Sequence, residues 1–283
     1  MHGNTQSDRR PWTFYALAGF FALFVLFLYG PMICIFVLSF QGPQGALVFP
    51  MRGTSLFWFE QLATQADAGD IVGAIQRSIP LALIVTALTV VISLAAGMAF
   101  RGRFRGANIL FYLVIASLVT PGYVLGIGIG LMFQLLGIDP HWYSSALGAH
   151  LSWTLPFGLL VMFAVFGRFN RAYEEAARDL GAGPGQILRL VIVPILLPGL
   201  IAVAPFGSTL SYDEFARTLQ TTGPTNTLPI EIWSMTQNVT SPSIYALGTL
   251  TTIFSFVVIT ASLSAIAAIQ RHRAGRALEG GKA

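Results

Sequence analysis

The sequence has little charge and almost no cysteine. Only 10% of its 283 residues are charged and 54% are hydrophobic, whereas soluble chains carry about 25% charged residues. A mean hydropathy of +0.69 leaves too few polar groups to cover a water-soluble globule of 30.5 kDa. The composition therefore excludes a cytosolic enzyme, a nucleic-acid-binding module and a disordered chain. The single cysteine, Cys34, excludes a disulfide framework and a metal site built on cysteines, which leaves an integral membrane protein.

Motifs for catalysis and nucleotide binding are also missing. Residues 183–185 lack the Lys-Ser/Thr of a Walker loop, and there is no His-Glu-x-x-His and no nucleophile with a plausible base. The alternating glycines of residues 126–130 are not followed, about 20 positions on, by the acidic residue that a dinucleotide site requires. We expect Gly126 and Gly130 to let two helices approach closely instead. The sequence thus predicts no enzyme activity, no cofactor and no metal on this chain.

Six stretches are long and apolar enough to cross a membrane, since a spanning helix needs roughly 20 mainly apolar residues. The predicted fold class is all-α, a polytopic membrane protein with six transmembrane helices. We expect Pro121 to kink the third span. The spans are about Phe14 to Phe40, Ser78 to Phe100, one within Gly106 to Ile138, one within Pro140 to Gly167, Leu190 to Tyr212, and about Ile244 to Ile269.

The distribution of basic residues predicts the orientation, because arginine and lysine are enriched in cytoplasmic loops. With the N-terminus inside, thirteen basic residues lie inside and three outside, so both termini are predicted to be cytoplasmic. The inside residues are Arg9, Arg10, Arg101, Arg103, Arg105, Arg168, Arg171, Arg178, Arg189, Arg271, Arg273, Arg276 and Lys282, and the outside residues are Arg52, Arg77 and Arg217. Seven acidic residues lie outside, at Glu60, Asp67, Asp70, Asp139, Asp213, Glu214 and Glu231.

Two outside segments are expected to be more than simple loops. Residues 41–77 mix aromatic and polar side chains and predict a short helix in the membrane interface. Residues 213–243 contain helix-breaking prolines and glycine together with apolar clusters. An irregular segment at membrane depth is tolerated only where it is buried in protein or lines a watery cavity. The second segment is therefore a candidate for the translocation path.

The longest inside loop, Arg168 to Gly199, predicts two short helices. Arg171 to Leu180 has helical propensity throughout, and its apolar residues form one stripe, at Tyr173, Ala176, Ala177 and Leu180. The charged residues lie around the other face, at Glu174, Glu175, Arg178 and Asp179. Glycines and Pro184 end this helix, and a second is expected over Gln186 to Val193, leading to Pro194 and the fifth span. A helix this apolar on one side must dock on something; the alternative is a solvated linker without a partner.

The same loop resembles the EAA loop of bacterial ABC importer permeases. Glu175-Ala176-Ala177 is followed after three residues by Gly181, and after nine more by Val191-Ile192-Val193-Pro194. The chain departs from that pattern only in carrying Val191 and Val193 where isoleucine and leucine are usual. The resemblance covers about Ala74 to Ala268. Residues 210–215, 222–224, 228–230 and 232–234 make the chain most similar to the spermidine/putrescine-type branch, and to its second permease subunit.

This resemblance implies a type I ABC importer permease fold in the bacterial inner membrane, with a polyamine as substrate. It divides the chain into residues 1–73 with the first span, a five-helix core at 74–268 with the coupling loop at 168–194, and a cytoplasmic tail at 269–283. The partners it implies are a second homologous permease, two ATP-binding subunits that hold the ATP, a periplasmic substrate-binding protein and membrane lipid, without nucleic acid. The residues it assigns to ATPase coupling are Glu174, Glu175, Ala176, Ala177, Gly181 and Pro194.

The acidic pair Asp213-Glu214, immediately beyond the fifth span, has two interpretations. It either caps the helix at the membrane edge, facing the outside water, or lines the path of a cationic substrate. In the second case Tyr212 and Trp233 offer aromatic faces for cation–π contact. His150, within the fourth span, is expected to be satisfied by internal contacts rather than to carry protons.

The alternative function is an ion-coupled secondary transporter, which needs no ATPase. Such proteins usually show internal repeats and ionisable residues within the membrane. The six predicted spans show no convincing repeat and their interiors carry almost no charge. A membrane-bound enzyme is a weaker alternative because the chain offers no catalytic site.

Overall fold

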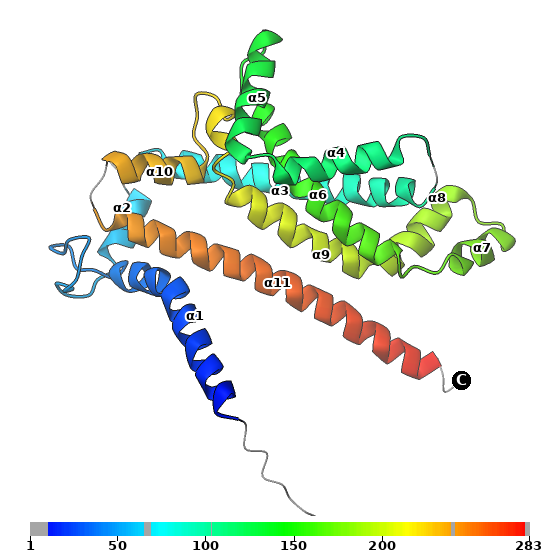
Figure 1. Ribbon diagram of the computed structural model, residues 1–283, viewed down its shortest axis with the longest axis horizontal. Helices are drawn as coiled ribbons and strands as arrows, with labels where there is room; N and C mark the ends of the chain where they lie inside the picture. The colour runs from blue at the N-terminus through cyan, green and yellow to red at the C-terminus, as the bar shows by residue number, and fades with distance from the viewer. Residues whose placement is uncertain (1–10, 65–68, 103, 239–240, 281–283) are drawn as a thin grey trace, which may run out of the picture. The chain divides into compact units, whose positions relative to one another are not determined.

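The computed structural model describes residues 11–64, 69–102, 104–238 and 241–280, and most of them are helical (Figure 1). In the described part, extended pairing is confined to one isolated bridge between Gln41 and Thr54. The all-α class is confirmed. The helices are α1 (Trp12–Leu38), α2 (Phe57–Thr64), α3 (Ile71–Phe100), α4 (Ala107–Val119), α5 (Gly122–Leu135), α6 (Ser145–Phe166), α7 (Ala172–Asp179), α8 (Pro184–Ile187), α9 (Val193–Tyr212), α10 (Leu228–Asn238) and α11 (Ser243–Gly280).

Five helices are each long and apolar enough to span a membrane, whereas the third predicted span is broken. The five are α1, α3, α6, the run Pro184–Tyr212 that contains α9, and Ser243–Ala268 of α11. In place of the third span stand α4 and α5, bent by 112° to each other. The kink expected at Pro121 is therefore a complete break. Thr120 before it is extended, with ψ 127°, because a proline ring disfavours helical geometry in the preceding residue.

The relative direction of α3 and α6 shows how the bent pair of α4 and α5 connects them. Thr89 of α3 meets Thr154 of α6, with 2.7 Å between their hydroxyl oxygens, and further along both helices Gly97 meets the ring of Phe166. The two helices are therefore parallel. The chain must return from the end of α3 to the start of α6, and α4 with α5 makes that return. The bent pair thus takes the place of one crossing, consistent with six spans.

The described residues form two compact units. One contains those up to residue 64 together with 241–251, and the other contains 69–238 and 252–280. In the first unit the ring of Phe59 in α2 lies 5.4 Å from that of Phe40, and the Tyr245 hydroxyl donates to the Leu47 carbonyl at 2.8 Å. The short helix predicted within residues 41–77 is confirmed as α2. Its place in the membrane interface stays a prediction.

The core of the second unit is a bundle of α3, α6 and α9, with α9 antiparallel to the other two. Gly199 of α9 packs on Val165 near the end of α6, and Gly207 packs on Thr86 in α3. A buried apolar cluster joins α6 to the beginning of α9, and includes Met162, Phe166, Ile192 and Leu196. Figure 1 shows α7 and α8 at one end of this bundle and α10 at the other.

The segment after α9 is packed inside protein, as its irregular sequence required. It forms a 3₁₀ turn at Thr218–Gln220 and then α10. The predicted close approach at two glycines is confirmed, but the partner is this turn rather than a second spanning helix. A Cβ on Gly126 would lie 2.6 Å from the Arg217 carbonyl oxygen, and one on Gly130 2.6 Å from that of Gln220.

Candidate coupling and substrate-path sites

Local sequence determines both ends of α7. Glu174 and Glu175 lie in its first turn and Arg178 in its last, where each charge complements the helix dipole. Beyond the last turn, Gly181 has a φ of +82°, the left-handed conformation that glycine adopts without steric penalty. The Ala182 N–H donates to the Ala177 carbonyl at 3.0 Å, which completes a Schellman motif. The predicted turn at Gly181 is confirmed.

The faces of α7 differ from those expected. Glu174 points inward, 8% exposed, and its Oε1 lies 2.6 Å from Nη1 of Arg101 at the end of α3. Ala177 packs on the buried cluster below, whereas Tyr173 is 55% and Leu180 90% exposed. The expected division into one apolar and one charged face is wrong, because the pairing of Glu174 with Arg101 turns this carboxylate toward the bundle.

The outward face of α7 carries two further residues assigned to coupling. Glu175 and Ala176 are exposed beside Tyr173 and Leu180. This surface combines two large apolar side chains with a carboxylate. Exposed apolar groups rimmed by charge are typical of a surface that another protein covers.

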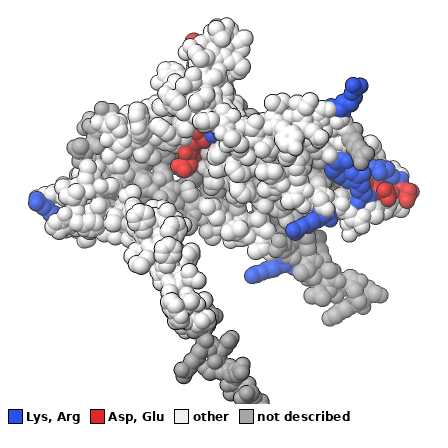
Figure 2. All heavy atoms as spheres, viewed as in Figure 1, with Lys and Arg blue, Asp and Glu red and all other residues white. Residues whose placement is uncertain are grey.

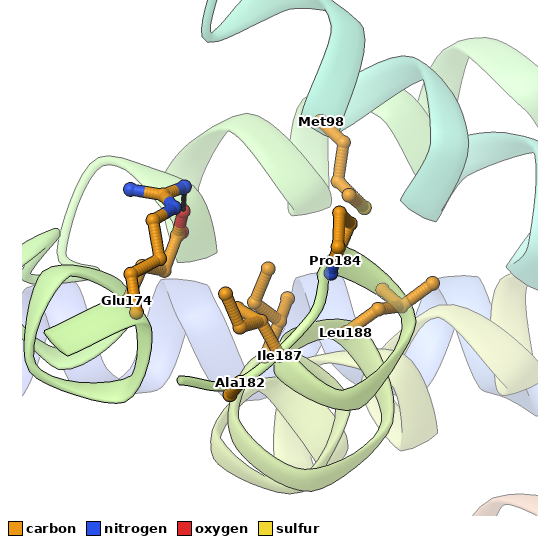
Figure 3. A pocket seen from close by; sticks show the side chains of 8 residues that line it. Met98, Glu174, Ala182, Pro184, Ile187 and Leu188 are labelled. Atoms are coloured by element: carbon orange, nitrogen blue, oxygen red, sulfur yellow. Dashed lines mark hydrogen bonds and ion pairs between the residues drawn. The ribbon is translucent and has the colours of Figure 1, made fainter. Parts of the chain in front are cut away.

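The predicted helix at Gln186 to Val193 and the fifth span form one continuous run, Pro184–Tyr212. A π turn at Leu188–Ile192 leads into α9, and the Val193 N–H bonds to the Leu188 carbonyl five residues back. Pro194 has no N–H to donate, and the wider turn just before it keeps the helical run continuous. A cavity of about 280 Å³ lies between this turn, α7 and α3; its lining includes Met98, Glu174, Ala182, Pro184, Ile187 and Leu188 (Figure 3).

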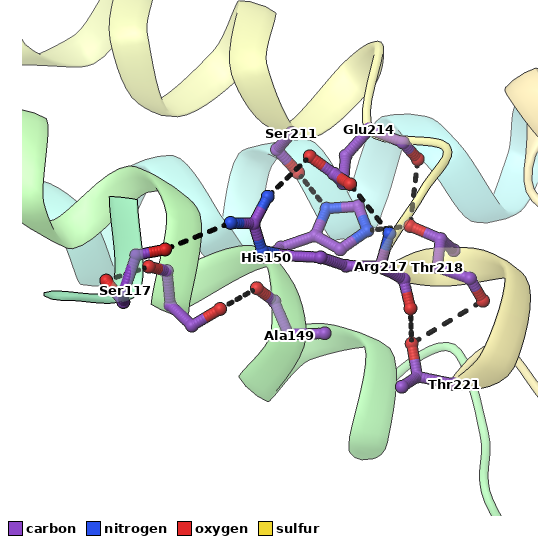
Figure 4. Close-up of polar contacts among 9 residues, drawn as sticks. Ser117, Ala149, His150, Ser211, Glu214, Arg217, Thr218 and Thr221 are labelled. Carbon is purple, nitrogen blue, oxygen red and sulfur yellow. Dashed lines mark hydrogen bonds and ion pairs between the residues drawn. The ribbon is translucent and has the colours of Figure 1, made fainter. Parts of the chain in front are cut away.

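The two residues of the acidic pair beyond α9 lie in different environments. Asp213 is exposed, whereas Glu214 is 7% and Arg217 3% exposed. Oε1 of Glu214 accepts from the Arg217 backbone N–H at 2.8 Å, and its Oε2 lies 3.4 Å from Nη1 of Arg217 (Figure 4). Glu214 therefore lies buried and paired, as a carboxylate inside protein requires, and its assignment to the substrate path stays a prediction.

Arg217 also contacts two further elements. Its guanidinium carbon lies 4.4 Å from the ring centroid of Trp153 in α6, and Nη2 donates to the Ser117 carbonyl of α4 at 3.2 Å. The sequence analysis placed Arg217 among the outside arginines and did not predict that it would be buried against these elements. Its spacing of three residues from Glu214, within an otherwise apolar and hydroxyl-rich segment, was the available signal.

His150 is satisfied internally, as predicted. It is 1% exposed, and its two ring nitrogens lie 2.7 Å from the hydroxyl oxygens of Ser211 and Thr218 (Figure 4). Both partners belong to the end of α9 and the turn after it. The histidine therefore fastens α6 to this segment.

The two aromatic residues proposed for the path have separate aromatic neighbours. The ring of Tyr212 lies 4.7 Å from that of Phe254 in α11, and the ring of Trp233 lies 5.8 Å from that of Phe215. Trp233 remains 46% exposed. Of the four path candidates, Asp213 and Trp233 are the exposed ones.

Basic side chains gather at the α7 end of the bundle (Figure 2), where Arg101, Arg171 and Arg178 surround one pocket. The prediction of membrane orientation also used charged residues that the structure does not describe. Arg9, Arg10, Asp67, Arg103 and Lys282 lie outside the described residues, as do the side chains of Arg273 and Arg276.

The chain is similar to transport proteins in both sequence and structure. Residues 89–276 match the family described as the binding-protein-dependent transport system inner membrane component. The spermidine/putrescine transport system permease protein PotC of Escherichia coli K12 is 31% identical over 246 residues, 86% of this chain and 91% of that protein. The putrescine transport system permease protein PotI of the same strain is 30% identical over 250 residues, 86% of each chain.

Solved structures agree on the fold. A chain of a bacterial ABC transporter that imports the acidic polysaccharide alginate aligns with a TM-score of 0.62, at 17% identity, covering 94% of this chain and 99% of that one. A chain of the MetNI methionine ABC transporter in an inward-facing conformation aligns with a TM-score of 0.56, at 19% identity, covering 70% of this chain and 95% of that one.

Proposed function

Because the chain belongs to the binding-protein-dependent inner membrane components, as a type I ABC importer permease of the spermidine/putrescine branch, we propose that it imports a polyamine. In this proposal it forms half of the translocation path and is driven by separate ATP-binding subunits through α7. The other half is a second, homologous permease, and a periplasmic binding protein delivers the substrate. ATP binds to the partner subunits, so this chain needs no cofactor of its own.

The proposed coupling to the ATP-binding subunits depends on the outward face of α7. ATP-driven closure of a separate ATPase must reach the membrane helices through a rigid contact. The exposed Tyr173, Glu175 and Leu180 offer apolar contact and a charge for charge-assisted hydrogen bonds. The end of the bundle that holds α7 is then cytoplasmic, as its cluster of arginines favours, and six crossings leave both termini on that side.

The proposal of a polyamine substrate depends mainly on the relatives, whose names include spermidine and putrescine. The exposed carboxylate of Asp213 after α9 supports it, since a polycation that loses water gains from an anionic group. Trp233 contributes an exposed aromatic face in the same segment.

The experiment is uptake by the reconstituted complex. The chain is co-expressed with its partner subunits, placed in proteoliposomes and supplied with binding protein and ATP. We expect uptake of labelled putrescine or spermidine that requires ATP, while a neutral sugar of similar size is not taken up. Uptake driven by an ion gradient without ATP would instead establish the secondary transporter.

A further inference from the structure

We propose that Arg101 and Glu174 form the tie that transmits the motion of α7 to α3 and α6. The inference depends on the proposed coupling role of α7. It assigns to Glu174 a role distinct from that of its neighbour Glu175, since Glu174 acts inside the chain and Glu175 on the outer face.

The contact between Arg101 and Glu174 is short and well shielded. Nη1 of Arg101 lies 2.6 Å from Oε1 of Glu174, with the side chains 16% and 11% exposed. Arg178 also approaches Glu174, at 3.3 Å, but its side chain is 59% exposed. Water screens an exposed pair and leaves it weak, whereas charges shielded from water attract each other more strongly. Of the two contacts of Glu174, the one with Arg101 is therefore the stronger candidate for coupling α7 to the end of α3.

Arg101 is positioned to pass that force on. It directly follows the last residue of α3, and its guanidinium carbon lies 5.2 Å from the ring centroid of Phe166 at the end of α6 and 5.0 Å from that of Phe169. Its backbone carbonyl accepts from Nη2 of Arg171 at 2.9 Å, at the start of α7. One residue thus joins the ends of α3 and α6 to α7.

The covalent connections of α7 do not by themselves hold its orientation. On one side it follows a short turn after α6, and on the other it ends at Gly181, whose left-handed turn is followed by two further glycines within residues 181–185. A glycine-rich connection allows rotation. The cavity of about 280 Å³ below α7 also leaves room for displacement toward the π turn. Together with the packing of Ala177 and the hydrogen bond from Arg171, the ion pair therefore holds α7 to the ends of α3 and α6.

The test separates transmission from assembly with four variants of the complete complex. Glu174→Gln and Arg101→Gln each remove one charge of the tie, and their combination removes both. Arg178→Gln is the matched control, since it removes only the exposed partner of the same carboxylate. Four quantities are measured. The first is the amount of ATP-binding subunit that copurifies, and the other three are measured in proteoliposomes: basal ATP hydrolysis, its stimulation by binding protein, and putrescine uptake per ATP.

We expect the control to behave as wild type. Glu174→Gln and Arg101→Gln should retain assembly and basal hydrolysis but lose at least 10-fold in uptake per ATP and most of the stimulation. The double variant should be no worse than either single variant, because partners in one contact are not additive. Unchanged uptake per ATP, additive losses, or a loss of assembled complex in the single variants would overturn the proposal, the last by making the pair purely structural.

Failure of the proposed function gives a different result. A wild-type complex that copurifies with ATP-binding subunits but does not take up putrescine argues against the substrate, and the stimulation of hydrolysis still tests the tie. A wild-type chain that binds no ATP-binding subunit removes the coupling role of α7 and the tie with it.

Discussion

Glu214 and Arg217 form a buried pair three residues apart, with the Glu214 carboxylate accepting from the Arg217 backbone N–H at 2.8 Å and lying 3.4 Å from its guanidinium. This relationship changes the meaning of the acidic pair after α9. The paired carboxylate holds the segment between α9 and α10 in place, and of the two acidic residues Asp213 is the exposed one. In the proposed path, the Glu214–Arg217 pair therefore has a structural role, and Asp213 is the carboxylate that a cationic substrate could meet.

Breaking this pair from one side should destabilise the protein. Arg217→Leu leaves the Glu214 carboxylate buried without its charged partner, which costs about 3–5 kcal/mol, and we expect a clearly lower thermal unfolding midpoint in detergent. The combination Glu214→Gln with Arg217→Leu should recover part of the loss, since it removes the stranded charge. A single variant as stable as wild type would show that the pair contributes nothing.

Asp213→Asn should lower uptake of a polyamine while leaving assembly and basal ATP hydrolysis intact, because this exposed side chain makes no hydrogen bond or ion pair with the described residues. Uptake is measured with saturating binding protein so that capture does not limit the rate. A several-fold lower rate is expected, and a normal rate would reduce Asp213 to a helix cap. Glu214→Gln serves as contrast, since its main effect should be on stability.

Gly181→Val should impair transport through backbone strain rather than through a clash. The φ of +82° is unfavourable for a β-branched residue, at a cost of about 1–2 kcal/mol, yet no atom lies within 4 Å of the added Cβ position. Gly185→Ala is the control, because its Cβ also meets open space without a positive φ. Equal activity of the two variants in the uptake assay would show that the turn tolerates other residues.

The glycines of α5 allow a matched comparison along one helix. Gly126→Ala and Gly130→Ala each place a Cβ 2.6 Å from a carbonyl oxygen of residues 217–220, whereas Gly128→Ala meets nothing within 4 Å. Overpacking costs about 1–3 kcal/mol, so the first two should lower the unfolding midpoint and the third should not. The same midpoint for all three variants would contradict the packing of α5 on the turn.

Glu175→Lys should prevent stable binding of the ATP-binding subunits, because it reverses the charge on the outward face of α7. The permease itself should insert and fold, since Glu175 is exposed. Copurification of ATP-binding subunits measures the effect, and size-exclusion behaviour of the isolated permease provides the control. Wild-type copurification together with normal uptake would exclude Glu175 from the contact.

The sequence alone determined the features that depend on local pattern. Apolar runs of spanning length predicted the long helices, because burying backbone groups in lipid requires a helix whatever the neighbours are. The spacing of Glu175, Gly181 and Pro194 predicted the coupling loop, and the glycines from Gly181 onward predicted the end of its first helix. The expected satisfaction of His150 also followed from its apolar surroundings, since a buried polar group needs partners.

Only the tertiary structure decided which polar groups meet. Arg217 reaches the Ser117 carbonyl, 100 residues away along the chain, and Glu174 turns inward because Arg101 stands at the end of a different helix. The bend after α4 became a complete break because α5 can pack its glycines on the turn after α9. Helical periodicity predicts which residues share a face, but which face is buried depends on partners that only the packed chain brings together.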